Sequence, residues 1–273
     1  MGRKSSFYYS FLVLPAEQRR AIIAVWDFCR VVDDAVDECP AVDAGGHAAG
    51  REAVTFWRAE LARCYEGQAA ETTEGRNLQP FIRQFDLPRQ AFEDVIDGVA
   101  MDLDTTRYQT FADLFEYCRR VASAVGMICI RIFGCHSERA REYALNLGVA
   151  LQLTNIIRDI KDDLDRGRAY LPLDDLESCQ CTLDDLRAGV VTGPVRRLLE
   201  FECRRARDFY QRAIHALPAD DRRRLVAAEI MRAVYFETLE RIERNDYDVF
   251  TSRARVPKPQ QALIALRQWL WPS

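Results

Sequence analysis

The sequence predicts an all-α protein that folds as one domain over residues 1–273. Apolar residues recur with the helical period along nearly the whole chain, and the alternation typical of strands is essentially absent. No Pro/Gly-rich linker and no repeat of 20–50 residues divides the chain. With 48% apolar and 29% charged residues, it can bury a large core and belongs to neither the disordered nor the low-complexity class.

The N-terminal half predicts four helices before a central segment. Pro15 opens a helix over 15–37, whose apolar stripe contains Ile22, Val25, Cys29 and Val32. Gly45, Gly46 and Gly50 then predict a loop. The pattern continues with helices over about 51–66, 75–85 and 88–101.

The second half begins with a segment over 110–134 that is apolar on more than one side, which predicts a central position in the bundle. A long helix over 137–164 follows and ends near Gly167. Amphipathic helices are expected over 182–188, 192–216 and 219–246. A short tail then carries Trp269 and Trp271, which either dock on the bundle or lie at a membrane interface.

Composition excludes several classes of partner and location. The net charge of −4 gives no reason to expect nucleic acid as a partner. Nine cysteines, an odd number without a C-x-x-C pair, are interpreted as buried thiols in a reducing compartment. The chain has no apolar run of about 18 residues and no convincing signal peptide, so a cytoplasmic location is expected, with peripheral membrane contact left open.

Two predicted helices carry acidic faces. Steps of four, three and four residues align Trp26, Arg30, Asp33 and Asp37 on the first helix. Steps of three, four and four residues align Gln152, Asn155, Asp159 and Asp163 on one face of the helix over 137–164.

A buried acidic face needs cations, because two carboxylates about 6 Å apart repel by roughly 3 kcal/mol at an effective dielectric near 20. Carboxylate and amide oxygens suit Mg²⁺, which usually takes one or two carboxylates together with substrate phosphate oxygens. The two helices therefore suggest a diphosphate held through Mg²⁺. A single D-x-x-x-D pattern is more often a solvated surface, so the prediction depends on having two of them in apolar helices.

Four motifs in this order resemble the squalene/phytoene synthase family over residues 4–250. They are segments 5–9 (SSFYY), 28–38 (FCRVVDDAVDE), 117–126 (YCRRVASAVG) and 151–163 (LQLTNIIRDIKDD). Within the family, segments 98–104, 107–108 and 167–172 are most similar to bacterial presqualene diphosphate synthases of the hopanoid pathway. The resemblance implies an isoprenoid-synthase-type helical bundle with a central active-site cavity.

The resemblance also implies roles for individual residues. The Mg²⁺ ligands would be Asp33, Asp37, Asn155, Asp159 and Asp163. Residues that contact the diphosphate or complete its pocket would be Ser6, Arg30, Gln152, Arg158, Arg168, Tyr170 and Tyr247. Tyr117 matches a tyrosine implicated in proton handling, and the prenyl channel would be lined by Phe7, Phe11, Trp26, Val121, Val125 and Gly126. The chain departs from the family pattern at Arg119 and Trp26, where similar members often carry tyrosine, and a charge near the pocket wall is expected at Arg119.

The implied reaction is the Mg²⁺-dependent condensation of two farnesyl diphosphates to presqualene diphosphate and diphosphate. Three alternatives stay open: a complete NADPH-dependent squalene synthase, a phytoene or dehydrosqualene synthase, and an inert scaffold for a hopanoid pathway. The proton acceptor could be Tyr117 or the departing diphosphate. Downstream squalene or hopanoid enzymes are possible partners.

Overall fold

The computed structural model describes residues 8–37 and 44–271, which are helical apart from loops and one isolated bridge between Arg107 and Ala169. This confirms the all-α prediction. The first half contains α1 (Tyr8–Leu12), α2 (Ala16–Asp37), α3 (Ala44–Glu66), α4 (Thr73–Gln84), α5 (Arg89–Asp104), α6 (Phe111–Cys118), the π-helical turn η1 (Arg119–Ser123) and α7 (Ala124–Ile132). The second half contains α8 (Glu138–Asp165), α9 (Leu173–Ser178), α10 (Leu183–Arg187), α11 (Gly193–Ala216), the 3-10 turn η2 (Ala219–Asp221), α12 (Val226–Arg244) and α13 (Lys258–Leu270).

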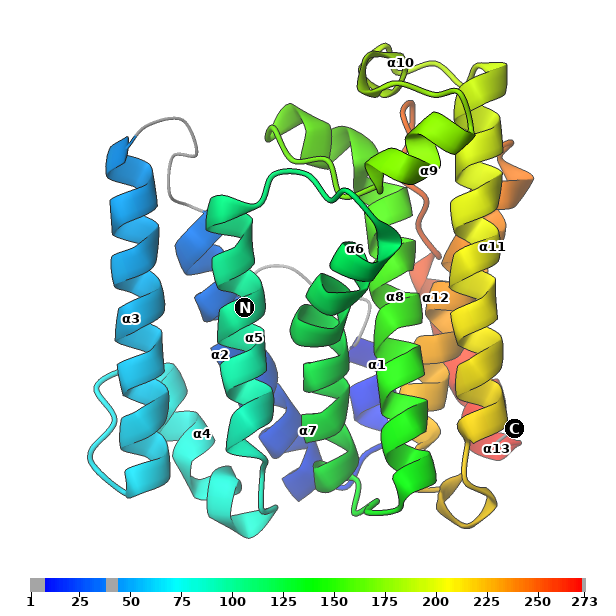
Figure 1. Cartoon of the computed structure of the whole chain (residues 1–273). Coiled ribbons are helices and arrows are strands. Elements are labelled where there is room, and N and C mark those ends of the chain that lie inside the picture. The colour runs from blue at the N-terminus through cyan, green and yellow to red at the C-terminus, as the bar shows by residue number, and fades with distance from the viewer. Residues whose placement is uncertain (1–7, 38–43, 272–273) are drawn as a thin grey trace.

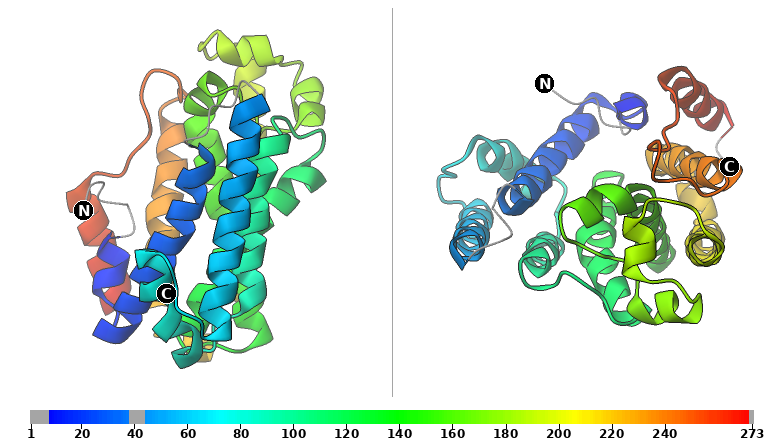
Figure 2. Two further views of the ribbon diagram at one scale, coloured as in Figure 1. Left: turned by 90° about the vertical axis from the view of Figure 1, so that its left-hand side faces the viewer. Right: turned by 90° about the horizontal axis from the view of Figure 1, so that it is seen from above.

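The long helices stand side by side in a bundle, with α8 in its interior (Figure 1). Helix α8 packs against α11, α7, η1 and α12, whereas α2 packs against α3, α4 and α5. Seen from above, α3 and α13 lie at opposite edges (Figure 2). The 28 residues of α8 make it about 42 Å long at 1.5 Å per residue, so one helix runs along most of the bundle.

The predicted loop at Gly45, Gly46 and Gly50 is wrong, because all three glycines lie inside α3. Gly50 faces α5, where a Cβ would come within 2.4 Å of Leu103 Cδ2. The glycine therefore permits α3 and α5 to approach closely rather than ending a helix.

The segment predicted as one helix over 110–134 contains the π-helical turn η1 between α6 and α7. Glycines face this wider turn from two neighbouring helices. A Cβ on Gly98 of α5 would lie 2.7 Å from Val121 Cγ1, and one on Gly148 of α8 would lie 2.5 Å from Ser123 Cα. The two glycines therefore permit α5 and α8 to pack closely on a π-helical turn, a feature that is frequent at functional sites.

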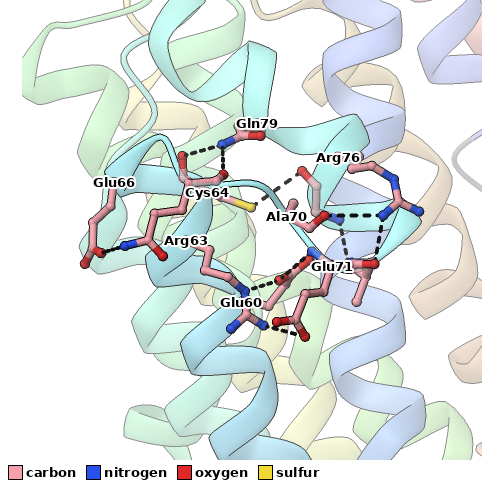
Figure 3. A network of polar contacts seen from close by, with 11 residues as sticks. Glu60, Arg63, Cys64, Glu66, Ala70, Glu71, Arg76 and Gln79 are labelled. Atoms are coloured by element: carbon pink, nitrogen blue, oxygen red, sulfur yellow. Dashed lines mark hydrogen bonds and ion pairs between the residues drawn. The ribbon is translucent and has the colours of Figure 1, made fainter.

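The connection between α3 and α4 is held by Glu60, whose side chain is fully buried (Figure 3). Its carboxylate accepts hydrogen bonds from the Thr72 amide and hydroxyl, both at 2.7 Å, from the Glu71 amide at 3.1 Å and from Arg63 Nε at 2.8 Å. Burial opposes ionisation, but these hydrogen bonds outweigh it and lower the pKa of Glu60.

One hydrophobic core cluster extends from Leu14 to Phe250, and a smaller one lies under α13. The eight cysteines in the described ranges are free thiols; six are buried, as predicted, whereas Cys29 and Cys129 are half-buried, and Cys39 lies outside those ranges. Within residues 8–37 and 44–271, no helix is long and apolar enough to cross a membrane.

Candidate active site

A cavity of about 470 Å³ opens between α1, α2, α5, the α6–η1–α7 segment, α8 and α12. It has a polar end, where Arg30 and Asp33 are exposed to solvent, and an apolar interior. The structure brings together most of the site residues that the sequence predicts: Phe11, Trp26, Arg30, Asp33, Tyr117, Val121, Val125, Gly126, Gln152, Asn155, Arg158, Asp159, Asp163, Arg168 and Tyr170.

Of the four remaining predicted site residues, three have side chains that the structure does not describe and one lies elsewhere. Ser6 and Phe7 lie outside the described residues, and Asp37 ends α2 but its side chain is not described. Tyr247 does not line the cavity: it follows α12 with a φ of +62° and packs beside Arg196, whose guanidinium carbon lies 5.9 Å from the ring centroid.

A different tyrosine of the same region, Tyr235, lines the cavity and was missed by the sequence analysis. It shares one face of α12 with Ala228 and Met231, which also line the cavity. The spacing of three and then four residues was a signal in the sequence that could have identified this face.

At the polar end, Asp159 of α8 is bound by two guanidinium groups. Arg158 donates from Nε and Nη2 to the two carboxylate oxygens at 2.7 and 2.6 Å, and Arg253 Nη2 donates to Oδ2 at 2.5 Å. Arg253 comes from the segment after α12, and no helical pattern pointed to it. The arginines neutralise a carboxylate that is largely buried.

The next carboxylate along this face, Asp163, is less well compensated. Burial and the nearby charge of Asp159 raise its pKa to about 7. One turn before Asp159, Asn155 Oδ1 is buried without a hydrogen-bond partner among the residues that the structure describes, while its amide nitrogen donates to Gln152 Oε1 at 3.4 Å. The amide oxygen of Asn155 and, two turns further along the same helix, the under-compensated carboxylate of Asp163 are oxygen donors of the kind that a hard cation such as Mg²⁺ takes together with phosphate oxygens.

The protein alone does not form a closed metal cage in the part of the chain that the structure describes. No three His, Cys, Asp or Glu side chains there lie close enough to hold a metal ion together. This agrees with Mg²⁺ sites in which one or two carboxylates act together with substrate phosphate oxygens. The residues that fit this role are Asp33, Asn155, Asp159 and Asp163.

A buried tyrosine cluster lies beside the polar end. Tyr117 and Tyr170 donate their hydroxyls to the two oxygens of Asp102, at 3.0 and 2.9 Å, and their rings stack with centroids 5.1 Å apart. All three residues line the cavity. Burial, followed by the negative charge of Asp102, raises the pKa of Tyr117 well above its usual value, so Tyr117 is a neutral phenol.

Asp102 was missed as a site residue, although it lies in a segment that carries the family resemblance. It stands three residues after the buried Val99 on α5 and is itself buried. A buried carboxylate in an otherwise apolar helix face was the available signal, because such groups are rarely buried without a partner.

The interior of the cavity is lined by apolar side chains, among them Val95, Val99, Ile130, Phe133 and Leu147. Arg119 does not contribute to this wall, contrary to the expectation from sequence. It pairs with Glu116 at 2.9 Å and with Asp94 at 3.1 Å, which holds its charge away from the cavity.

A family model for squalene/phytoene synthases matches residues 2–260. The chain belongs to the squalene/phytoene synthase family. It is therefore a head-to-head prenyltransferase type of enzyme that acts on prenyl diphosphates. The isoprenoid-synthase-type fold expected from the resemblance is confirmed by the solved structures that share it.

Two similar sequences are phytoene synthases. The 15-cis-phytoene synthase of Synechocystis sp. is 37% identical over 97% of this chain and 80% of that protein. The phytoene synthase of Arthrospira platensis is 37% identical over 92% of this chain and 84% of that protein.

Two similar solved structures have other names. A dehydrosqualene synthase in complex with a ligand has a TM-score of 0.84 at 25% identity, covering 97% of this chain and 90% of that one. The squalene synthase HpnC from Alicyclobacillus acidocaldarius has a TM-score of 0.77 at 34% identity, covering 89% of each chain.

Proposed function

We propose that the enzyme condenses two molecules of farnesyl diphosphate into presqualene diphosphate and inorganic diphosphate, with Mg²⁺ as cofactor. This proposal rests on one observation, a single cavity that has oxygen ligands at its polar end and an apolar interior. The polar end suits a cation and a diphosphate, and the apolar interior suits a prenyl chain.

Mg²⁺, when bound, would supply the positive charge that favours loss of the diphosphate leaving group. Arg30, Arg158 and Arg168 line the same end and would hold phosphate oxygens by charge-assisted hydrogen bonds. After the C1–O bond breaks, side chains such as Val99 and Val121 would keep water from the allylic cation.

Carbon–carbon bond formation follows when the 2,3-double bond of the second farnesyl diphosphate attacks C1. Loss of a proton then closes the cyclopropane. Tyr117 is a weak base by itself, but Asp102 accepts its hydroxyl proton at 3.0 Å, so the phenol oxygen can take a proton while it passes its own to Asp102. We assign proton removal to this pair, with the departing diphosphate as the alternative acceptor.

A phytoene synthase activity on geranylgeranyl diphosphate is the second candidate, because the similar proteins from Synechocystis sp. and Arthrospira platensis carry that name. The names of the two solved structures favour C15 chemistry instead. A complete squalene synthase stays open as the third.

Product analysis by mass spectrometry separates these candidates. The purified enzyme would be incubated with Mg²⁺ and either farnesyl or geranylgeranyl diphosphate, with and without NADPH. We expect presqualene diphosphate from farnesyl diphosphate in both the presence and the absence of NADPH. Squalene formed only with NADPH, or product formed only from the C20 substrate, would replace the proposal by the corresponding alternative.

A matched pair of variants tests the proton step. Tyr117→Phe removes the hydroxyl that donates to Asp102, and we expect cyclopropane closure to slow. Tyr108→Phe is the control, because the Tyr108 hydroxyl is buried with no hydrogen-bond partner in the described part of the chain and Tyr108 does not line the cavity. Equal product rates in both variants would remove Tyr117 from the proton step and leave diphosphate as the acceptor.

A further inference from the structure

Helix α13 is apolar on two opposite faces. One face docks on the bundle: Gln261 and Ala265 are buried, and Ile264 packs on the small core cluster formed with Ile230 and Val234. Roughly half a turn away, Leu263, Leu266 and Leu270 form a stripe that is exposed to solvent, with Leu263 65% exposed. We call this set the α13 stripe.

Two tryptophans extend the exposed apolar surface at the end of the helix. Trp269 is 57% and Trp271 is 71% exposed. Together with the α13 stripe, they make up half of the large hydrophobic residues that the described surface exposes. A concentration of this kind on one short element marks an interaction surface, because exposed apolar residues are usually scattered singly.

The charged residues of the α13 segment itself are all positive. Arg255, Lys258 and Arg267 lie in or beside α13, and residues 249–273 contain no Asp or Glu, although the chain as a whole carries −4. On the helical wheel, Arg267 lies about 40° from Leu263 at one side of the stripe, and Lys258 lies in the first turn of the helix. Leucine and tryptophan on one face with basic residues beside them are the features of a helix that lies in the surface of a membrane.

The same charges argue against a second copy as the occupant. Two α13 stripes packed on each other would bring the basic residues of both copies together with no carboxylate from this segment to compensate them. Anionic lipid headgroups would compensate them instead. The 13 residues of α13 are too few to span a bilayer, which takes about 20, so the helix would lie along the surface.

The position of α13 connects this surface to the cavity. Helix α13 packs against α1 as well as α12, and α1 and α13 lie side by side at one edge of the molecule (Figure 2). Phe11 of α1 lines the cavity, and its neighbour Leu12 is exposed. An apolar surface beside a cavity wall would place the enzyme next to the phase in which a long prenyl product dissolves.

We propose that the α13 stripe, with Trp269 and Trp271, binds the surface of a membrane that contains anionic lipids. The proposal concerns attachment and does not depend on which prenyl diphosphate the enzyme uses.

Vesicle co-sedimentation tests it with the full chain and without substrate. We expect binding to vesicles of phosphatidylcholine with phosphatidylglycerol, weaker binding to phosphatidylcholine alone, and loss of the difference at high salt. Leu263→Gln should weaken binding about tenfold. Arg267→Gln should weaken binding to the anionic vesicles about fivefold at low salt.

Val190→Gln is the matched control, because Val190 is also exposed but lies in the loop between α10 and α11. Helix α10 and helix α13 lie at opposite ends of the bundle (Figure 1). The control variant should bind vesicles as the wild type does. Absence of binding to either vesicle, or equal loss in Leu263→Gln and Val190→Gln, would overturn the proposal. If the protein does not bind vesicles but forms a dimer in solution that Leu263→Gln dissociates, the α13 stripe binds a second copy of the chain and the proposal is overturned.

Discussion

Replacing Gly148 by alanine tests the close contact between α8 and η1 that shapes one wall of the cavity. The added Cβ would lie 2.5 Å from Ser123 Cα and 2.6 Å from Ser123 N. Carbon atoms in ordinary contact are about 3.5–4.0 Å apart, so the two segments would have to separate by about 1 Å. Both contacted atoms belong to the backbone, and a change of rotamer cannot relieve the clash.

The free energy of unfolding should fall by about 2 kcal/mol. Overpacking a core costs about 1–3 kcal/mol, and a clash with backbone atoms belongs at the upper end of that range. Alanine recovers about 1 kcal/mol because it favours a helix over glycine. For a chain of this size, the net loss corresponds to a melting temperature about 4–8 °C lower.

Thermal and urea unfolding followed by circular dichroism would measure the loss. Gly126→Ala is the matched comparison on α7, since its Cβ would lie 3.0 Å from Ala144 O, a contact that a shift of a few tenths of an ångström relieves. It should stay within about 1 kcal/mol of the wild type. A Gly148→Ala variant as stable as the wild type, or more stable, would refute the close approach of α8 to η1.

Three further predictions concern buried polar groups. Asp102→Leu removes the acceptor that Tyr117 and Tyr170 share, so the free energy of unfolding in urea should fall by about 2–4 kcal/mol. Asp102→Asn should lose less. Equal stability of Asp102→Leu and the wild type would contradict the shared acceptor. Glu60→Gln should lose about 2 kcal/mol at pH 7. Folding lowers the pKa of Glu60, so its carboxylate stabilises the fold above the unfolded pKa of about 4.3, and this stabilisation is lost as the pH falls through the lower folded pKa. The difference in unfolding free energy between Glu60→Gln and the wild type should therefore shrink in acid. A difference that does not change with pH would contradict this. Burial raises the pKa of the Cys29 thiol, which lines the cavity, to about 12. This thiol should therefore react with iodoacetamide at pH 8 much more slowly in the native than in the urea-unfolded protein, as peptide mass spectrometry would show. Equal rates would contradict the raised pKa.

The helices that build the site could be predicted because their periodicity is strong and uninterrupted. The ranges 15–37 and 137–164 match α2 and α8 to within a residue at each end. The polar face of α8 with Asn155, Asp159 and Asp163 followed from spacing alone, and the structure places these side chains on the cavity.

Features that depend on tertiary packing could not be predicted in the same way. The three glycines of α3 lower helix propensity, yet one of them is required by the approach of Leu103, which local sequence does not reveal. The π-helical turn leaves the apolar pattern of 110–134 almost unchanged. Arg253 donates to Asp159 from a position 94 residues later in the chain, and no local sequence pattern can predict such a contact.

Release of inorganic diphosphate from farnesyl diphosphate, measured against Mg²⁺ concentration, tests the central claim that Asp33 and Asp159 hold the metal and the leaving group. Asp27→Ala and Asp165→Ala are the controls, because these carboxylates lie on the same two helices, are exposed and do not line the cavity. We expect Asp33→Ala and Asp159→Ala to abolish Mg²⁺-dependent release while their helical circular dichroism and both controls stay normal. Near-normal release in the Asp33→Ala and Asp159→Ala variants would contradict the account.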